Sequence, residues 1–218
     1  MLRRVSAARM QRGMTDDNPI RVETCTGPAL LPLLPGLQRL RAEVFRTWPY
    51  LYNGDPAQEI SYMRELAQSP SAAIVVAWSG QVPVGMATCL PLVDESANIR
   101  APFEAARLQV ERFFYFGESV LLPPWRGRGI GVRFFAGREA QAVARGADFA
   151  CFCAVVRSDT DSRQPVGHVP LDAFWGKRGY RPMPGLTCMM RWREVGDAAE
   201  SDHRLQFWGK ALGDAALP

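Results

Sequence analysis

The stretch "PPWRGRGIG", residues 123–131, lies between a strongly β-prone run, "RFFYFGESVLL", and an amphipathic segment, "GVRFFAGREAQAVARG". Glycines between a strand and a helix let the backbone approach a ligand closely. The arginines beside them favour an anionic ligand. The stretch therefore predicts an α/β domain in which a phosphate-bearing ligand binds between a strand and a helix.

The spacing of the glycines excludes two common phosphate loops. A dinucleotide fingerprint, G-x-G-x-x-G, that begins at Gly127 requires a glycine where the chain has Val132. The G-K-S/T ending of a P-loop does not occur. Arg126, Gly129 and Gly131 fit a third pattern, R/Q-x-x-G-x-G/A. Its successive N–H groups and the helix N-terminus form a nest suited to a diphosphate.

The helix expected after the loop is amphipathic. Helical spacing puts one set of small and apolar side chains on a face that we expect to be buried: Val132, Phe135, Ala136, Ala140 and Val143. Polar side chains are expected largely on the opposite face: Arg133, Arg138, Gln141 and Arg145. Gly146 is a natural end for this helix.

Length and charge limit the class of protein. The 218 residues suit one α/β domain, and no apolar run is long enough to span a bilayer. Residues 1–13 hold four arginines and no acid, and the remaining 22 basic side chains balance 22 acidic ones. A neutral body argues against nucleic-acid binding. Residues 1–17 are expected to be a disordered leader before a domain at 18–218.

The five cysteines are odd in number and include no C-x-x-C. This pattern indicates reduced core thiols in a cytoplasmic protein, because disulfide frameworks use paired cysteines in oxidising compartments. With only two histidines, a metal site is not expected.

Alternating and helical patterns predict seven strands in a mixed sheet: strand, two helices, two strands, a connection, then strand–helix–strand–helix–strand–strand. Within this order, "SVLLPPWRGRGIGVRFFAGREAQA" resembles motif A of the GNAT superfamily, the N-acetyltransferases that use acetyl-coenzyme A (acetyl-CoA). "DAFWGKRGY" resembles the family's later motif, and the region also resembles a bacterial GNAT group that has no assigned substrate. The resemblance implies one α/β (α+β) domain, a mostly antiparallel sheet flanked by helices, and central strands that splay apart.

The resemblance also implies coenzyme contacts. The diphosphate would be held by the backbone N–H groups of the loop: Arg126, Gly127, Arg128, Gly129, Ile130, Gly131 and Val132. The main chain of Val120, Leu121 and Leu122 would pair with the pantetheine arm, and the short helix with Phe174, Trp175 and Lys177 would flank the coenzyme. For Phe174 and Trp175 simple core packing is an equal alternative.

Acetyl transfer needs a neutral amine, and an amine with a pKa of about 10.4 is almost wholly protonated at pH 7. Glu118 is the candidate base, because it lies on a mostly apolar strand with Val120 and Leu122 on the same face. Such surroundings are expected to raise its pKa. An equally weighted alternative is a structural carboxylate that binds loop N–H groups or an arginine.

The proton donor to the sulfur departs from the family pattern. Many members have a tyrosine where this chain has Trp175, and an indole does not act as an acid. Tyr180 is expected to pack in the core. The candidates are therefore Tyr115, another group such as His168, water, or no donor at all.

The acceptor site implied by the resemblance includes the loop "RTWPYLYNGDP". The loop contributes four candidate residues: Trp48, Tyr50, Tyr52 and Asp55. They form either an aromatic cage with one acid, which would suit a cationic amine, or a loop whose rings cover the core.

The sequence as a whole favours an enzyme that moves an acetyl group from acetyl-CoA to a primary amine on a small molecule or peptide by direct attack, acting as a monomer or homodimer. The alternatives are a coenzyme-A-binding sensor without turnover and, less favoured, binding through the basic leader.

Overall fold

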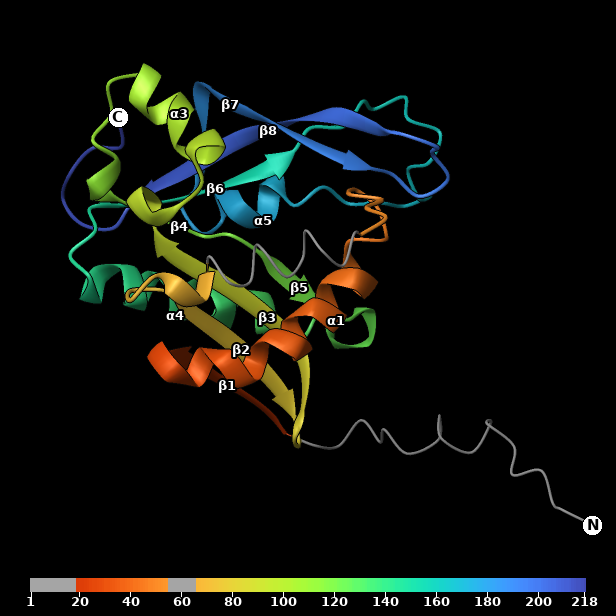
Figure 1. The fold of residues 1–218 in the computed structure, drawn as a ribbon, viewed down its shortest axis with the longest axis horizontal. Helices are drawn as coiled ribbons and strands as arrows, with labels where there is room; N and C mark the ends of the chain where they lie inside the picture. The colour runs from red at the N-terminus through yellow and green to blue at the C-terminus, as the bar shows by residue number, and fades with distance from the viewer. Residues whose placement is uncertain (1–18, 55–65) are drawn as a thin grey trace, which may run out of the picture.

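Eight strands form one sheet in the order β1-β2-β3-β4-β6-β8-β7, and β5 pairs with β3 beside this path. The computed structural model describes residues 19–54 and 66–218 (Figure 1). The strands are β1 (Ile20–Thr26), β2 (Ala73–Ser79), β3 (Val82–Pro91), β4 (Phe113–Tyr115), β5 (Ser119–Leu121), β6 (Phe149–Val155), β7 (Arg181–Arg193) and β8 (Glu200–Ala211). The β4–β6 pair is parallel and the other named pairs are antiparallel. The predicted mixed, mostly antiparallel α/β sheet is confirmed, with one more strand than expected.

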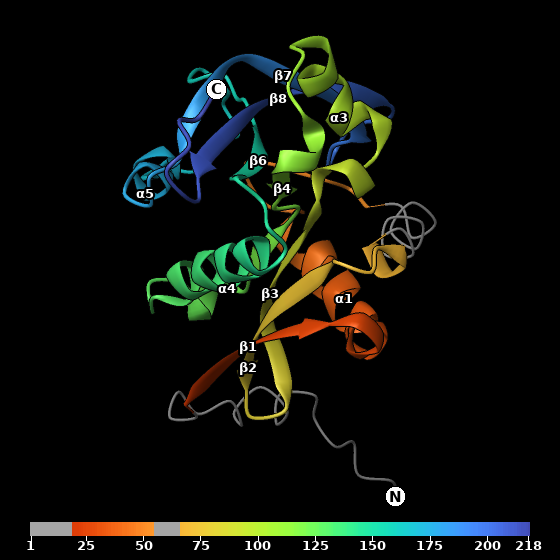
Figure 2. The same ribbon diagram turned by 90° about the vertical axis from the view of Figure 1, so that its left-hand side faces the viewer.

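The helices cover both faces of the sheet. They are α1 (Leu34–Val44), α3 (Ala97–Ala105), α4 (Ile130–Ala144) and α5 (Asp172–Gly176), and a 3₁₀-helix over Gly27–Leu33 precedes α1. Figure 2 shows α1 and α3 on one side and α4 and α5 on the other. The largest core cluster includes side chains from α1, α3 and the facing strands, so the sheet is buried on this side along most of its length. None of the helices in the described part of the chain is long and apolar enough to cross a bilayer.

The buried face of α4 differs from the one that we predicted. The most buried line of residues is Ile130, Phe134, Arg138 and Ala142, each four positions after the last. Val132 and Val143, which were expected inside, are 43% and 56% exposed. The prediction was wrong because it assigned Arg138 to the solvent side on account of its charge. That assignment placed the buried face on the wrong side of the helix and left out Ile130 and Phe134. Phe135 is buried as expected.

The cysteines are free thiols, and four of the five are buried in the core. The predicted leader, residues 1–17, lies outside the described residues.

Candidate functional site

The sheet opens between two neighbouring residues. The N–H of Phe116 donates to the carbonyl of Cys151 in β6 at 2.7 Å, whereas the N–H of Gly117 donates to the carbonyl of Thr88 in β3 at 3.1 Å. Beyond this point β5 pairs with β3, and β6 continues with β8 as its partner. The predicted splay of the central strands is therefore confirmed, and it divides the run "RFFYFGESVLL" into β4 and β5.

A β-bulge accompanies the opening. Leu90 pairs with Tyr115 and Ala87 with Ser119, so three steps along β3 match four steps on the other chain. The extra residue reverses the alternation of side chains. As a result Tyr115 and Glu118, which are three positions apart, both face the side of the sheet that α1 covers.

A cleft of about 1440 Å³ passes through the opening. Its lining includes Arg126 and Gly131 at the start of α4, and Glu118 and Phe116 at the splay. At the other end it is lined by residues of the loop that follows α1, of the end of β6 and the residues after it, and of β7: Trp48, Pro49, Tyr50, Tyr52, Val155, Val156, Arg157, Met190 and Trp192. The cleft therefore connects the predicted coenzyme loop to the predicted acceptor loop.

The glycine loop has the geometry of an anion-binding turn. Gly127 and Gly129 have φ values of +75° and +76°, which side chains larger than glycine rarely adopt, and no atom lies within 4 Å of an added Cβ at either position. Helix α4 begins directly after Gly129, and no side chain caps it and no acid lies in its first turn. The first N–H groups of α4 are thus available to an anion, and these residues fit a diphosphate.

Alternate residues of β5 turn their main-chain N–H and C=O groups toward the opening. The N–H of Leu122 donates to the carbonyl of Val84 in β3, so Leu122 and, by alternation, Val120 face β3. The N–H and C=O groups of Ser119 and Leu121 face the opposite way, into the gap. The carbonyl of Leu121 accepts a hydrogen bond of 3.1 Å from Arg126 Nε. Of the three residues predicted to pair with pantetheine, Leu121 has this orientation, and Ser119 was missed.

The arginines of the loop turn toward the protein in this structure. The guanidinium of Arg128 lies 4.9 Å from the ring centre of Trp125, which belongs to the 3₁₀-helix Pro123–Trp125. Trp125 is 3% exposed. The backbone of the loop is consequently better placed than these side chains to form the floor of the nest.

Helix α5 lies against the start of α4. An added Cβ on Gly131 would lie 3.1 Å from Phe174 Cζ, so the ring covers the first turn of α4 closely. Trp175 packs between Phe152 and Trp208, with ring centres 5.0 Å apart in both cases. Phe174 and Trp175 both pack against neighbouring rings and both line the cleft. Lys177 is exposed.

Tyr180 packs in the core, as predicted. It is 1% exposed, and its hydroxyl donates to Glu139 at 3.0 Å. It therefore does not replace the missing tyrosine at the sulfur.

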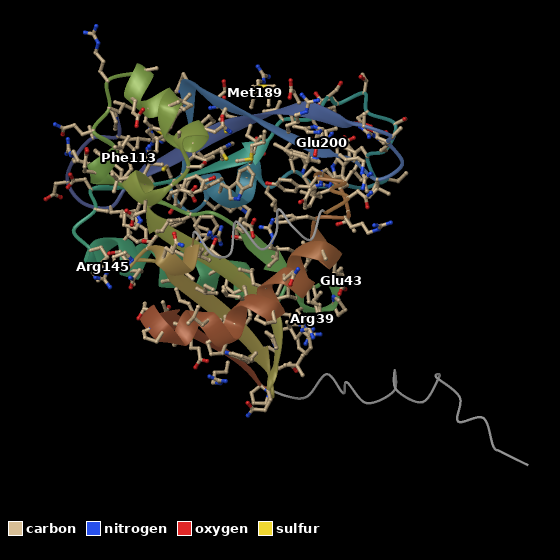
Figure 3. All side chains as sticks on the ribbon, in the orientation of Figure 1. Arg39, Glu43, Phe113, Arg145, Met189 and Glu200 are labelled. Carbon is tan, nitrogen blue, oxygen red and sulfur yellow. The ribbon has the colours of Figure 1, made fainter. Side chains whose placement is uncertain are left out.

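Glu118 forms an ion pair with Arg41 of α1. The side chains are 15% and 9% exposed, whereas Arg39 and Glu43 of the same helix lie on the surface (Figure 3). The second carboxylate oxygen of Glu118, Oε2, is buried and has no hydrogen-bond partner among residues 19–54 and 66–218. The predicted contact with an arginine is present, and it uses one of the two carboxylate oxygens. No local sequence pattern indicated Arg41.

Tyr115 lies beside Glu118 on the same face and is 4% exposed. Its hydroxyl is 3.1 Å from Cys153 Sγ. Burial raises the pKa of this phenol well above its ordinary value, with a smaller contribution from Cys153. Tyr115 is therefore protonated at neutral pH and is a weak acid.

The predicted acceptor residues that the structure describes lie at the far end of the cleft. The ring of Tyr50 contacts Phe45 at 4.8 Å, and that of Trp48 meets His168 edge-on at 5.9 Å. Tyr52 forms an isolated bridge with Glu194. Trp48 and Tyr50 thus pack against different neighbours instead of facing each other. Asp55 lies outside the described residues.

Arg157 holds this loop in place. Its Nε donates to the carbonyl of Pro49 at 2.6 Å and its Nη2 to the carbonyl of Tyr50 at 3.0 Å. Glu194 is 2% exposed and pairs with Arg157, Arg163 and, at 3.5 Å, His203. The Glu194 cluster, meaning these four residues, joins the acceptor loop to β7 and β8. Within the described residues no group of three or more potential ligands could hold a metal ion.

Comparisons with known proteins agree with this geometry. The model of the "Acetyltransferase (GNAT) family" matches residues 37–180. No curated protein sequence matches the chain. The fold is similar to a GNAT-family protein from Desulfovibrio desulfuricans, at 10% identity and a TM-score of 0.55, covering 89% of this chain and 100% of that one.

Two further solved structures are similar. One is a protein from Salmonella typhimurium solved with its cofactor acetyl-CoA, at 12% identity and a TM-score of 0.52, covering 92% of this chain and 98% of that one. The other is the ribosomal-protein-alanine N-acetyltransferase from Brucella melitensis, at 16% identity and a TM-score of 0.54, covering 88% and 99%. At these identities the likeness concerns the fold alone.

Proposed function

This chain belongs to the acetyltransferase (GNAT) family, and we propose that it transfers an acetyl group from acetyl-CoA to a primary amine by direct attack. The observation that carries the proposal is the cleft through the splayed strands, with the uncapped start of α4 at one end and Glu118 at its centre. Acetyl-CoA supplies the acetyl group: the amine nitrogen bonds to the carbonyl carbon, the carbon–sulfur bond breaks, and the sulfur keeps the electron pair.

The residues before and within the glycine loop bind the coenzyme in this proposal. The N–H groups from Arg126 to Val132 hold the diphosphate at the positive end of α4. The main-chain groups of Ser119 and the N–H of Leu121 pair with the amides of the pantetheine arm, as an added strand does. Phe174, Trp175 and Lys177 form the wall on the side of α5.

Glu118 is the proposed general base. Its Oε2 accepts the proton that the attacking amine loses, and Arg41 holds the other oxygen. The positive charge of Arg41 favours the ionised carboxylate, which is the form that a base requires. Tyr115 is the proposed proton donor to the sulfur, although burial opposes the loss of its proton. The rings of Trp48, Tyr50 and Tyr52 and the carboxylate of Asp55 are proposed to contact the acceptor.

Calorimetric titration with acetyl-CoA and with coenzyme A tests the binding step. Gly129→Glu places a strained side chain and a negative charge at the nest, so we expect it to weaken binding by more than 100-fold. Gly146→Glu is the matched control, because Gly146 also has a φ of +75° and no atom within 4 Å of an added Cβ, but follows the far end of α4. We expect this control to bind within about twofold of the unmodified protein. A folded protein that binds neither ligand contradicts the proposal.

Thiol release in the presence of a panel of primary amines tests the chemistry. Glu118→Gln should lower the rate by roughly 10²- to 10⁴-fold, the usual contribution of a general base. Coenzyme affinity should stay unchanged in this variant. Tight coenzyme binding without thiol release from any amine would instead support the alternative of a coenzyme-A-binding sensor.

A further inference from the structure

Arg138 is a buried cation that the proposed mechanism does not use. It lies in the apolar line of α4 between Phe134 and Ala142, is 2% exposed, and lines the cleft. Its guanidinium is stacked against two rings, 4.5 Å from the centre of Phe116 and 4.7 Å from that of Phe135. Phe116 is the residue at which the sheet opens.

No carboxylate among the described residues pairs with Arg138. Within residues 19–54 and 66–218 its one hydrogen bond runs from Nε to the carbonyl of Phe134 at 3.3 Å. The adjacent acid, Glu139, pairs instead with Lys210 at 2.9 Å and accepts from the hydroxyl of Tyr180. The two Nη groups of Arg138 are therefore available at the cleft.

Burial of a cation without a carboxylate partner is unfavourable, and a hydrophobic side chain of similar size is often at least as stable in such a place. Burial lowers the pKa of Arg138 to about 10, so the side chain is still charged at neutral pH. A charge retained under these conditions indicates that an anion lies beside it in the working state of the protein.

The position of Arg138 indicates which anion this is. Figure 2 shows that α4 and α1 cover opposite faces of the sheet. Arg138 is a buried residue of α4 and Arg41 a buried residue of α1, so Arg138 and the Arg41–Glu118 pair approach the opening from opposite sides. The proposed diphosphate site is at the start of α4, and eight residues of helix advance about 12 Å from Ile130 to Arg138. That direction leads from the diphosphate along α4 toward the opening at Phe116.

We propose that Arg138 donates hydrogen bonds to the coenzyme sulfur and stabilises the thiolate that departs during acetyl transfer. This inference rests on the proposed function. The carbon–sulfur bond breaks with its electron pair on sulfur, the new nitrogen–carbon bond forms, and the amine proton passes to Glu118. Arg138 compensates the negative charge on sulfur, so no acid is required at the position of Trp175. The thiolate takes up its proton in a later step, from Tyr115 or from solvent.

The test is the affinity of the protein for coenzyme A and for desulfo-coenzyme A between pH 6.5 and pH 9, measured by calorimetry. A cysteine thiol has a pKa of about 8.5. Each unit by which the protein lowers the pKa of the coenzyme thiol makes the thiolate bind tenfold more tightly than the thiol. We expect coenzyme A to gain up to about tenfold over desulfo-coenzyme A as the pH rises. This range stays below the pKa of Arg138.

Arg138→Met removes the charge and keeps most of the volume. We expect it to abolish this pH-dependent gain, to leave the affinity for acetyl-CoA within about threefold, and to leave the melting temperature of the free protein equal or higher. Arg145→Met is the control, because Arg145 is exposed beyond the other end of α4 (Figure 3). It should retain the gain.

Two results would overturn the inference. One is equal pH dependence for the two ligands in the unmodified protein, a measurement that needs no variant. The other is tighter binding of succinyl-CoA than of acetyl-CoA that is lost in Arg138→Met, since Arg138 would then recognise an acyl carboxylate. Failure of acetyl-CoA to bind at all contradicts the proposed function instead, so the two failures are distinguishable.

Discussion

Arg41 on α1 and Glu118 beside β5 form an ion pair within the cleft, and each side chain is at most 15% exposed. The pair connects the helix on the acceptor side to the bulge at which the sheet opens. Arg41 uses its charge to orient a carboxylate whose other oxygen is buried and has no partner in the described part of the chain. Arg41 is therefore a positioning residue in the proposed mechanism.

Arg41→Met should lower both the stability of the protein and the rate of acetyl transfer. A carboxylate that loses its buried partner typically lowers the free energy of unfolding by about 3–5 kcal/mol. We also expect acetyl transfer to fall at least tenfold with coenzyme affinity unchanged, because the base is no longer oriented. Urea unfolding and thiol release measure the two effects. Arg39→Met on the exposed face of α1 is the control, and Arg41→Lys should recover part of the rate.

A double variant separates the charge from the fold. Arg41→Met combined with Glu118→Gln should be more stable than Arg41→Met alone, because no uncompensated carboxylate is left. If both Arg41 variants transferred acetyl groups as fast as the unmodified protein, the positioning role would be wrong.

Tyr115→Phe distinguishes proton donation from charge stabilisation at the sulfur. Burial raises the pKa of the Tyr115 phenol well above its ordinary value, which makes proton transfer from it unfavourable. We therefore expect turnover to fall by about tenfold or less, with coenzyme affinity unchanged. Cys153→Ser, which changes the atom 3.1 Å from the Tyr115 hydroxyl, is a matched control for disturbance of this contact. A loss of 100-fold or more in Tyr115→Phe alone would assign the departure of the sulfur to proton transfer.

The sequence predicted the parts of the site that depend on local pattern. The spacing of Arg126, Gly129 and Gly131 identified the loop, and the β-prone run before it identified the strand that enters the splay. The same run was expected to be one strand. The bulge at Glu118 could not be predicted, because it results from pairing with β3 and β6.

Contacts between elements that are distant along the chain could not be predicted from the sequence either. Arg138 was expected in solvent, because helical periodicity assigns a charge to the polar face and does not show what packs on that face. The partner of Glu118 comes from α1, and the partners of Tyr50 and Trp48 come from β7 and the loop after β6. Composition gives no information about these pairings.

Glu194 should make stability depend on acid pH. Burial raises the pKa of its carboxyl, but hydrogen bonds from Arg157 and Arg163 outweigh this and hold the pKa below its ordinary value. A lowered pKa gives a stabilising contribution that is complete above the ordinary value of about 4.3 and is lost as the pH falls through the folded value. His203 and Asp161, which pair with Glu194 and Arg163, are the other titratable groups in contact.

Urea unfolding of Glu194→Gln checks this expectation. The variant should be about 3–5 kcal/mol less stable than the unmodified protein at pH 7, because Arg157 and Arg163 lose their buried carboxylate. The difference should shrink toward pH 3. A difference that stays constant between pH 7 and pH 3 would show that the charge of Glu194 contributes nothing. Because Arg157 also holds Pro49 and Tyr50, we expect the KM for the amine to rise while coenzyme affinity is kept.

Gly131→Ala tests whether α5 is a wall of the coenzyme site. The new Cβ would lie 3.1 Å from Phe174 Cζ. The Phe174 ring also packs against two other side chains: the guanidinium carbon of Arg178 lies 3.7 Å from its centre, and the centre of the Phe135 ring lies 5.9 Å away. The ring must move by a few tenths of an ångström, so we expect coenzyme affinity to fall by about three- to tenfold. Stability should be unchanged or higher, because alanine is the better helix former by about 1 kcal/mol.

Gly176→Ala provides the control for this prediction, because Gly176 lies in α5 with nothing within 4 Å of an added Cβ. The double variant Gly131→Ala/Phe174→Leu identifies the cause of the loss. Leucine is smaller than phenylalanine and can yield to the methyl group, so affinity should return if α5 was displaced. If affinity stays low in the double variant, the methyl group itself excludes the diphosphate from the first turn of α4, and Phe174 is a packing residue without a role at the coenzyme.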